Sequence, residues 1–257
     1  YSGRGHGVVQ PGFAAMMRRV VSRRWLPLTI LVAAAVIGLG SLGVWQVRRL
    51  NERRALNTDI QARLAAPAIE LTGAVADPAA LNYRQVRGQG AFDPGPEIVL
   101  RNQARQDEPG VHLRTPLRLA GSDQAVFIDR GWIPYDAPRS QYPAPGEAVI
   151  IEGIARATQA RQGWLSPLDP ALTAELTRVE SWYRVDIARI QEQTPYPLLP
   201  IFVQQTQGFA GGLLPAADVE IDLSDGPHLS YAIQWFAFAT TLLIGYGFLI
   251  QHQSADA

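Results

Sequence analysis

The sequence predicts an α+β membrane protein in which two transmembrane helices flank a compact, antiparallel β-rich extracytoplasmic domain of barrel or sandwich type. Two observations predict this fold class. A stretch of 23 residues without a charged side chain lies near each end of the 257-residue chain. Between these stretches, short runs of β-forming residues alternate with turns rich in Pro and Gly, and no longer repeat is visible.

The first uncharged stretch, residues 25–47, has the length of a transmembrane helix. A rise of about 1.5 Å per residue gives about 34 Å, enough to cross a hydrocarbon core of roughly 30 Å. Pro27 falls in the first turn, where a missing N–H does little harm. A signal peptide is the alternative, but the apolar run is too long and no small-residue cleavage site follows it.

The second uncharged stretch, residues 229–251, carries aromatic residues near both of its ends. Tyr231, Trp235 and Phe236 at the start and Tyr246 near the end suit the aromatic belt of a membrane interface. A buried helix of a soluble protein fits poorly, because this segment is long and apolar on every face. We therefore expect a second transmembrane helix here.

Two spans place both termini on one side of the membrane and residues 48–228 on the other. Five Arg residues and no acidic residue precede the first span, while five Arg with Glu52 and Asp59 follow it. The count of positive charges is a tie, and the acid-free arm favours a cytoplasmic N-terminus. We expect a cytoplasmic arm over residues 1–24, an extracytoplasmic domain over residues 48–228, and a short tail over residues 252–257.

The segment between the spans begins with a helix and continues in strands. A helical extension is expected over residues 48–66, because Leu56, Ile60 and Leu64 recur every four residues before Pro67. The β-rich part covers residues 67–228. Its expected strands are Tyr83–Phe92, Glu97–Asn102, Val111–Leu119, Ala125–Trp132, Ala148–Ala157, Ser181–Asp186 and Ile201–Gln205. Short helices are expected at Asp169–Arg178 and Ile187–Gln193.

The composition excludes several classes of function. All 23 basic residues are Arg, and they balance 23 acidic residues, while residues 48–228 hold 18 Arg against 22 acids; both counts argue against a nucleic-acid binder. The absence of Cys excludes disulfides, thiolate metal sites and Cys nucleophiles. The four His residues are too scattered for a zinc site: they are His6, His112, His228 and His252.

Motifs that would indicate an enzyme are missing. There is no nucleophile elbow, P-loop, zinc-protease motif or dinucleotide fingerprint, so we expect no catalytic residues and no enzyme. Asp129 is expected to form an ion pair with its neighbour Arg130. An acidic stretch before the second span is expected to be a solvated loop rather than a cation site; it holds Asp218, Glu220, Asp222 and Asp225.

Three clusters are less easily explained by fold alone. The first, residues 42–49, reads Leu-Gly-Val-Trp-Gln-Val-Arg-Arg and ends the first span with Gln46 inside an apolar edge. The second, residues 129–134, is Asp-Arg-Gly-Trp-Ile-Pro at a strand end. The third, residues 225–236, opens the second span with His228, Tyr231, Ala232 and Trp235 on one helical face. Taken singly, each is also compatible with interface anchors or turn chemistry.

In this order the clusters resemble the Surfeit locus protein family, the Surf-one or Shy-one type of cytochrome c oxidase assembly factor. The matching residues are Gly43, Trp45, Gln46, Arg49, Tyr83, Arg84, Gly88, Phe92, Gly110, Thr115, Pro116, Arg130, Gly131, Trp132, Pro134, His228, Tyr231, Gln234 and Trp235. Residues 160–193 show no motif of this family.

The resemblance implies a chaperone-like assembly factor for the haem a-containing terminal oxidase of the respiratory chain. Such a protein binds and delivers haem a, or scaffolds its insertion. The implied partners are the catalytic subunit of cytochrome c oxidase, haem a synthase and the lipid bilayer. The implied location is the bacterial inner membrane, or the mitochondrial inner membrane in a eukaryote. A permanent accessory subunit of a respiratory oxidase that handles no haem is the alternative.

The resemblance also implies where haem a binds. His228 is the expected ligand of the haem iron, as the imidazole of His is a common haem ligand. Two spans also place the end of the first and the start of the second at the same membrane depth. The residues that share this layer with His228 are therefore the other expected contacts, with an Arg holding a propionate: Trp45, Gln46, Arg48, Arg49, Tyr231, Gln234 and Trp235. A second axial ligand is not assigned; His112 qualifies only if its strand folds down to the membrane.

Overall fold

The computed structural model describes residues 20–160, 163–208, 214–217 and 219–252. The chain forms two compact units, each described separately here. The helical unit comprises residues 1–58 and 223–257, and the barrel unit comprises residues 59–222. Most of the expected N-terminal arm, almost all of the C-terminal tail and Asp218 of the acidic stretch lie outside the described residues.

Two long helices dominate the helical unit. Helix α2 runs from Leu26 to Ala65 and helix α5 from His228 to His252. Both are long and apolar enough to cross a membrane, judged by length and composition. Helix α2 covers the predicted first span and its predicted extension without a break, because no Pro or Gly interrupts the sequence between Val44 and Ala66.

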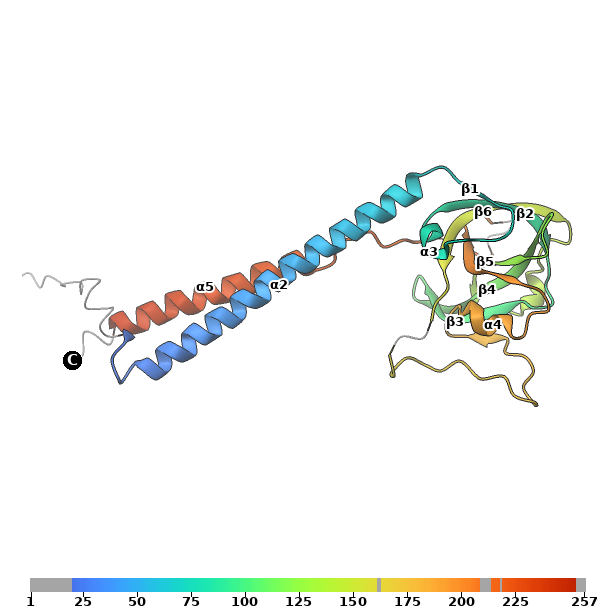
Figure 1. Ribbon diagram of the computed structural model, residues 1–257. Coiled ribbons are helices and arrows are strands. Elements are labelled where there is room, and N and C mark those ends of the chain that lie inside the picture. The colour runs from blue at the N-terminus through green and yellow to red at the C-terminus, as the bar shows by residue number, and fades with distance from the viewer. Residues whose placement is uncertain (1–19, 161–162, 209–213, 218, 253–257) are drawn as a thin grey trace, which may run out of the picture. The chain divides into compact units, whose positions relative to one another are not determined.

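The two helices of this unit pack side by side and antiparallel (Figure 1). Each presents one narrow stripe to the other, and successive buried positions in a stripe are 3, 4, 7 or 11 residues apart. On α2 the buried members are Val32, Gly43, Gln46, Leu50 and Asn57; on α5 they are Ala232, Ala239 and Ile250. A Cβ added to Gly43 would lie 2.7 Å from the Phe236 ring. Small residues therefore permit the close approach typical of packed membrane helices.

In its described residues, the barrel unit consists of eight strands and short helices. Their order is β1 (Ile69–Leu71), α3 (Pro78–Leu81), β2 (Gln85–Phe92), β3 (Ile98–Arg105), β4 (Glu108–Leu119), β5 (Ala125–Pro134), a 3₁₀ turn (Arg139–Gln141), β6 (Ala148–Ala157), β7 (Ser181–Trp182), α4 (Ile187–Gln191) and β8 (Leu198–Gln205). Each of the seven predicted strands overlaps one of these. Strand β1 and helix α3 were not predicted.

Five of the strands close into a barrel. The hydrogen-bonded order β2-β6-β8-β5-β4 returns to β2 through a pairing between β2 and β4. Strand β3 extends β4 as a hairpin, and β1 and β7 lie at the sheet ends. The predicted barrel is confirmed. Three pairings, β1 with β2, β3 with β7 and β5 with β8, are parallel, which the strand pattern did not reveal.

Strand β5 contributes to two cores, one on each of its faces. Val126 and Ile128 belong to the first apolar cluster, whereas Ala125 and Phe127 belong to the second, which includes helix α4. Alternation along the strand sends neighbouring side chains to opposite faces. Strand β5 is thus buried on both sides for nine of its ten residues.

The helix predicted at Asp169–Arg178 is wrong. The chain is irregular there, and the Asp169 carboxylate accepts a hydrogen bond from the backbone N–H of Tyr183 at 2.6 Å. This carboxylate is buried against another part of the chain, so it does not cap a helix. The predicted strand from residue 181 to 186 is also shorter than expected and ends at Trp182. The short helix at residues 187–191 is confirmed as α4.

Candidate functional site

Gln46 and His228, both predicted site residues, meet between α2 and α5. The distance between His228 Nδ1 and Gln46 Oε1 is 2.8 Å. Gln46 occupies the buried stripe of α2 with 9% of its surface exposed, and His228 opens α5. Together with the hydrogen bond between Thr29 and Tyr246 further along the same helices, this polar pair helps to fix their register. The sequence placed these residues at one depth, and the structure adds that they are in contact.

The hydrogen bond selects one form of the imidazole ring. An amide oxygen only accepts, so Nδ1 of His228 carries the proton and donates it to Gln46. In the neutral ring, Nε2 then keeps its lone pair. This arrangement is the one in which His binds metals, with one nitrogen oriented by a hydrogen bond and the other available as a ligand.

Three side chains of α2 hold the backbone just before α5. Asn57 Nδ2 donates to the carbonyls of Leu223 and Ser224 at 2.7 and 3.1 Å. Arg53 Nε donates to the Ser224 carbonyl at 3.1 Å, and Arg54 forms an ion pair with Asp225 at 2.7 Å. These contacts fix the entry of α5 and hence the position of its first residue. They were not predicted, although Asn57 continues the stripe spacing that contains Gln46.

The other predicted residues of this site surround the stripe. Trp235 is half-buried, whereas Trp45, Tyr231, Gln234, Arg48 and Arg49 are exposed. The Cζ of Arg49 lies 5.7 Å from the centroid of the Trp45 ring, and its Nη1 also pairs with Glu52 at 2.8 Å. The structure therefore joins Gln46 with His228 and leaves the remaining aromatic and guanidinium groups on exposed faces of the same helices.

In the barrel unit, the side chain of Arg130, from the second cluster, links β5 to Glu97 and to the loop before β6 by hydrogen bonds. Its Nη1 contacts Glu97 at 3.2 Å, and its Nη2 donates to the carbonyls of Tyr142 and Pro143 at 2.8 Å each. Thr115 Oγ1 also donates to Glu97, at 2.6 Å. Burial lowers the pKa of Arg130, and Glu97 opposes this shift. The Arg-Gly-Trp motif thus has a structural role in the barrel.

The predicted ion pair between Asp129 and Arg130 is wrong. The two residues are neighbours on β5, so their side chains leave opposite faces of the strand. The partner of Asp129 is Arg114, at 2.9 Å, and both side chains are 3% exposed. His112 Nδ1 also lies 2.9 Å from the Asp129 carboxylate. Although burial alone raises the pKa of Asp129, Arg114 and His112 together hold it below the ordinary value.

The glycines of the motifs allow close contacts that any side chain would prevent. Gly131 has φ of +122°, and a Cβ there would lie 2.4 Å from the Ala216 carbonyl oxygen. A Cβ on Gly110 would lie 2.2 Å from Nε1 of Trp132. These positions seat the segment around Ala216 and the indole of Trp132 against the sheet.

The described part of the acidic stretch supports the expectation of a loop. Asp225 pairs with Arg54. Among the residues that the structure describes, no group of three or more His, Cys, Asp or Glu side chains could hold a metal ion. His112, the residue considered as a second haem ligand, lies on β4 in the barrel unit and faces Asp129.

Comparisons with known proteins agree with the motif set. The model of the SURF1 family matches residues 33–240. A SURF1-like protein of Monosiga brevicollis is 26% identical over 234 residues, covering 85% of both chains. A SURF1-like protein of Rickettsia prowazekii is 24% identical, covering 86% of this chain and 88% of its own length. Surfeit locus protein 1 of Mus musculus is 24% identical, with coverages of 80% and 69%. Since the family model covers most of the chain, including both helices of the Gln46–His228 pair, the chain belongs to the SURF1 family.

Proposed function

We propose that this protein is an assembly factor for the haem a-containing terminal oxidase and delivers haem a to the catalytic subunit. Membership of the SURF1 family supports the role in general. The observation that carries the haem-handling part is the hydrogen bond between Gln46 and His228, which leaves Nε2 of His228 available as a ligand. Haem a is the cargo in this proposal, and no chemical change of haem and no enzymatic activity is included.

The residues around the pair fit a haem in chemical character. Imidazole is a common ligand of haem iron. Trp235 lies near the stripe and offers an aromatic surface for a porphyrin, while Arg48 and Arg49 are exposed guanidinium groups that suit propionates. Exposed apolar residues of α2 and α5 would accommodate the hydrophobic tail within lipid. His228 would supply one axial ligand to the iron.

The proposed location is the inner membrane of a bacterium, or of a mitochondrion in a eukaryote, with the barrel unit on the extracytoplasmic side. Two helices suited to spanning a membrane support membrane association. Relatives occur in Rickettsia and in mouse, which fits both settings. Haem a synthase and the oxidase catalytic subunit are the proposed partners before and after the transfer.

A deletion strain complemented with variants tests the proposal. Deletion should lower the amount of assembled, haem a-containing oxidase while haem a synthesis continues. Wild-type protein and Gln251→Leu, an exposed position at the other end of α5, should restore the oxidase, whereas His228→Ala should not, at equal protein levels in the membrane. A normal oxidase content in the deletion strain would contradict the assembly role.

Purification of the oxidase and of this protein from the complemented strain distinguishes a permanent subunit from a transient factor. A transient factor should be absent from purified, active oxidase, and the isolated protein should show a haem a absorption spectrum. Stoichiometric co-purification with active oxidase, without haem in the free protein, would instead identify an accessory subunit.

A further inference from the structure

A loop of the barrel unit exposes large apolar side chains that its own core does not use. Trp164 is 83% exposed, Leu165 78% and Leu168 69%. By contrast, Trp132 and Trp182 of the same unit are 3% and 1% exposed. Concentrated apolar exposure of this kind on a folded surface marks a binding region for an apolar partner. We call residues 164–168 the apolar tip.

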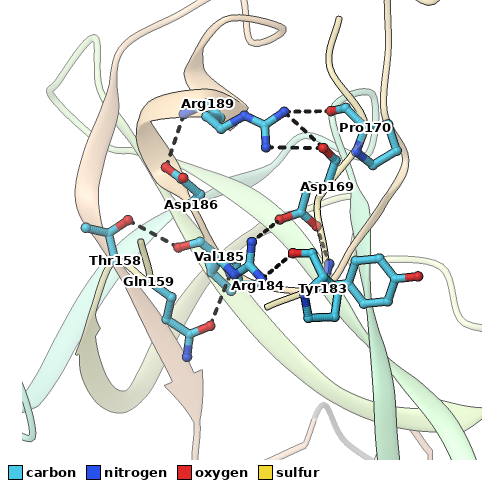
Figure 2. Close-up of polar contacts among 10 residues, drawn as sticks. Thr158, Gln159, Asp169, Pro170, Tyr183, Arg184, Val185, Asp186 and Arg189 are labelled. Atoms are coloured by element: carbon cyan, nitrogen blue, oxygen red, sulfur yellow. Dashed lines mark hydrogen bonds and ion pairs between the residues drawn. The ribbon is translucent and has the colours of Figure 1, made fainter. Parts of the chain in front are cut away.

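The apolar tip is anchored by a buried polar cluster at its base (Figure 2). The Asp169 side chain is fully buried and forms an ion pair with Arg184 at 3.0 Å. Arg184 also donates to the Pro167 carbonyl, and Arg189 to the Pro170 carbonyl, at 2.6 Å each. The base is thus held against β7 and α4 by charge-assisted hydrogen bonds, and the adjoining apolar side chains remain outside the core.

The anchor also removes negative charge from the surface of the loop. Between Thr158 and Asp169 the sequence contains one acidic residue, Asp169 itself, whose carboxylate is neutralised by Arg184. The tip therefore has no carboxylate that contact with an apolar phase would desolvate, a step that is costly for a charged group. Nor would it repel anionic lipid headgroups.

We propose that the apolar tip inserts into the lipid interface of the membrane that α2 and α5 span, as a third membrane contact of the chain. Trp and Leu are the side chains that favour this zone. The barrel unit is joined at both ends to segments of the helical unit, so the chain itself holds the tip at a high effective lipid concentration. Weak insertion by three side chains then suffices. This inference goes beyond the proposed handling of haem and does not depend on it.

Because the chain contains no Cys, a single introduced Cys can be labelled without reaction at any other position. The full-length Leu165→Cys variant is labelled with an environment-sensitive fluorophore and reconstituted in vesicles of phosphatidylethanolamine and phosphatidylglycerol. Asp123→Cys, on the exposed turn between β4 and β5, is the matched control. We expect a blue-shifted emission and severalfold stronger quenching by nitroxide-labelled lipids at position 165 than at position 123.

Leu168→Cys provides an independent second position in the tip. If both tip positions give the emission of the control and are quenched equally by aqueous iodide, the tip does not insert and the proposal is wrong. If shielding appears only in membranes that also contain oxidase, and not in pure lipid vesicles, the tip binds protein and the lipid proposal is likewise overturned.

Discussion

Replacing Gln46 by Leu should weaken haem binding without removing the iron ligand. The substitution deletes the acceptor of the His228 Nδ1–H and places an apolar side chain of similar size in the stripe between α2 and α5. Ligation at Nε2 draws electron density from the ring and strengthens the hydrogen bond at Nδ1. The bond is therefore worth more in the haem-bound state than in the free protein.

The size of the effect follows from the burial of Gln46. At 9% exposure, the site offers little room for water to replace the lost oxygen. In the haem-bound state, ligation at Nε2 keeps the proton on Nδ1. The unsatisfied buried donor then costs about 1–3 kcal/mol, which corresponds to a decrease in affinity of roughly fivefold to 150-fold. Loss of a partner that orients a metal-binding His typically has a consequence of this size.

Absorbance titration of the full-length protein in micelles with haem measures this affinity. Gln251→Leu is the matched control, because Gln251 lies on α5, is exposed and is not a proposed haem contact. Gln46→Glu should retain binding, since a carboxyl group also accepts from Nδ1. Wild-type affinity of the Gln46→Leu variant would refute the positioning role of Gln46, and an equal loss of affinity in Gln251→Leu would point to a nonspecific effect on the helices.

Four further predictions concern stability and topology. Asp129→Asn leaves Arg114 as an uncompensated buried charge and should cost about 3–5 kcal/mol, seen as a lower melting temperature by circular dichroism, whereas Asp123→Asn on an exposed turn should change it little. Because the folded state lowers the pKa of Asp129, its stabilisation is complete above the ordinary value of 3.8 and is lost as pH falls through the lower folded value. The melting temperature of the wild type should therefore fall in this acid range, and the contribution of Asp129 to that fall should be missing in Asp129→Asn. Gly131→Ala should destabilise the barrel by more than Gly121→Ala, although both have positive φ, because a Cβ at 131 meets a carbonyl and one at 121 meets open space; equal melting temperatures would contradict this. A reporter active only in the cytoplasm should give signal when fused after Asp256, and signal from a fusion within residues 140–146 would reverse the proposed topology.

Local patterns predicted much of the fold. The uncharged stretches correspond to α2 and α5, and the strand at residues 148–157 was predicted with its observed ends. Pairing partners were harder to predict, because β5 and β8 are adjacent in the barrel but some 60 residues apart in the chain. Strand β1 has only three residues and no alternation of its own to detect.

The contact between Gln46 and His228 was not predicted from the sequence. Because the chain crosses the membrane twice, the end of the first span and the start of the second lie at one depth, and so do Gln46 and His228. Their contact depends in addition on the rotation of each helix about its axis. The spacing from Val32 through Gly43 and Gln46 to Asn57, which is 11, 3 and 11 residues, determines that rotation, since it keeps these positions on one face of the helix. The Asp129 partner was missed because proximity in sequence was taken for proximity in space. On a strand, the side chains of two neighbouring residues leave opposite faces, whereas the side chain of the paired residue across the sheet, here Arg114 opposite Asp129, lies on the same face.

Closure of the barrel by β8 has a consequence for the order of folding during synthesis. Strand β8 lies between β5 and β6, and its residues emerge from the ribosome after those of every other strand. Until then, the edge of β5 and the edge of β6 that pair with β8 in the finished barrel have no partner. Unpaired strand edges promote association between chains. Closure requires contacts between distant parts of the chain, which slows folding. Chains truncated before Leu198 should therefore aggregate rather than form a smaller barrel.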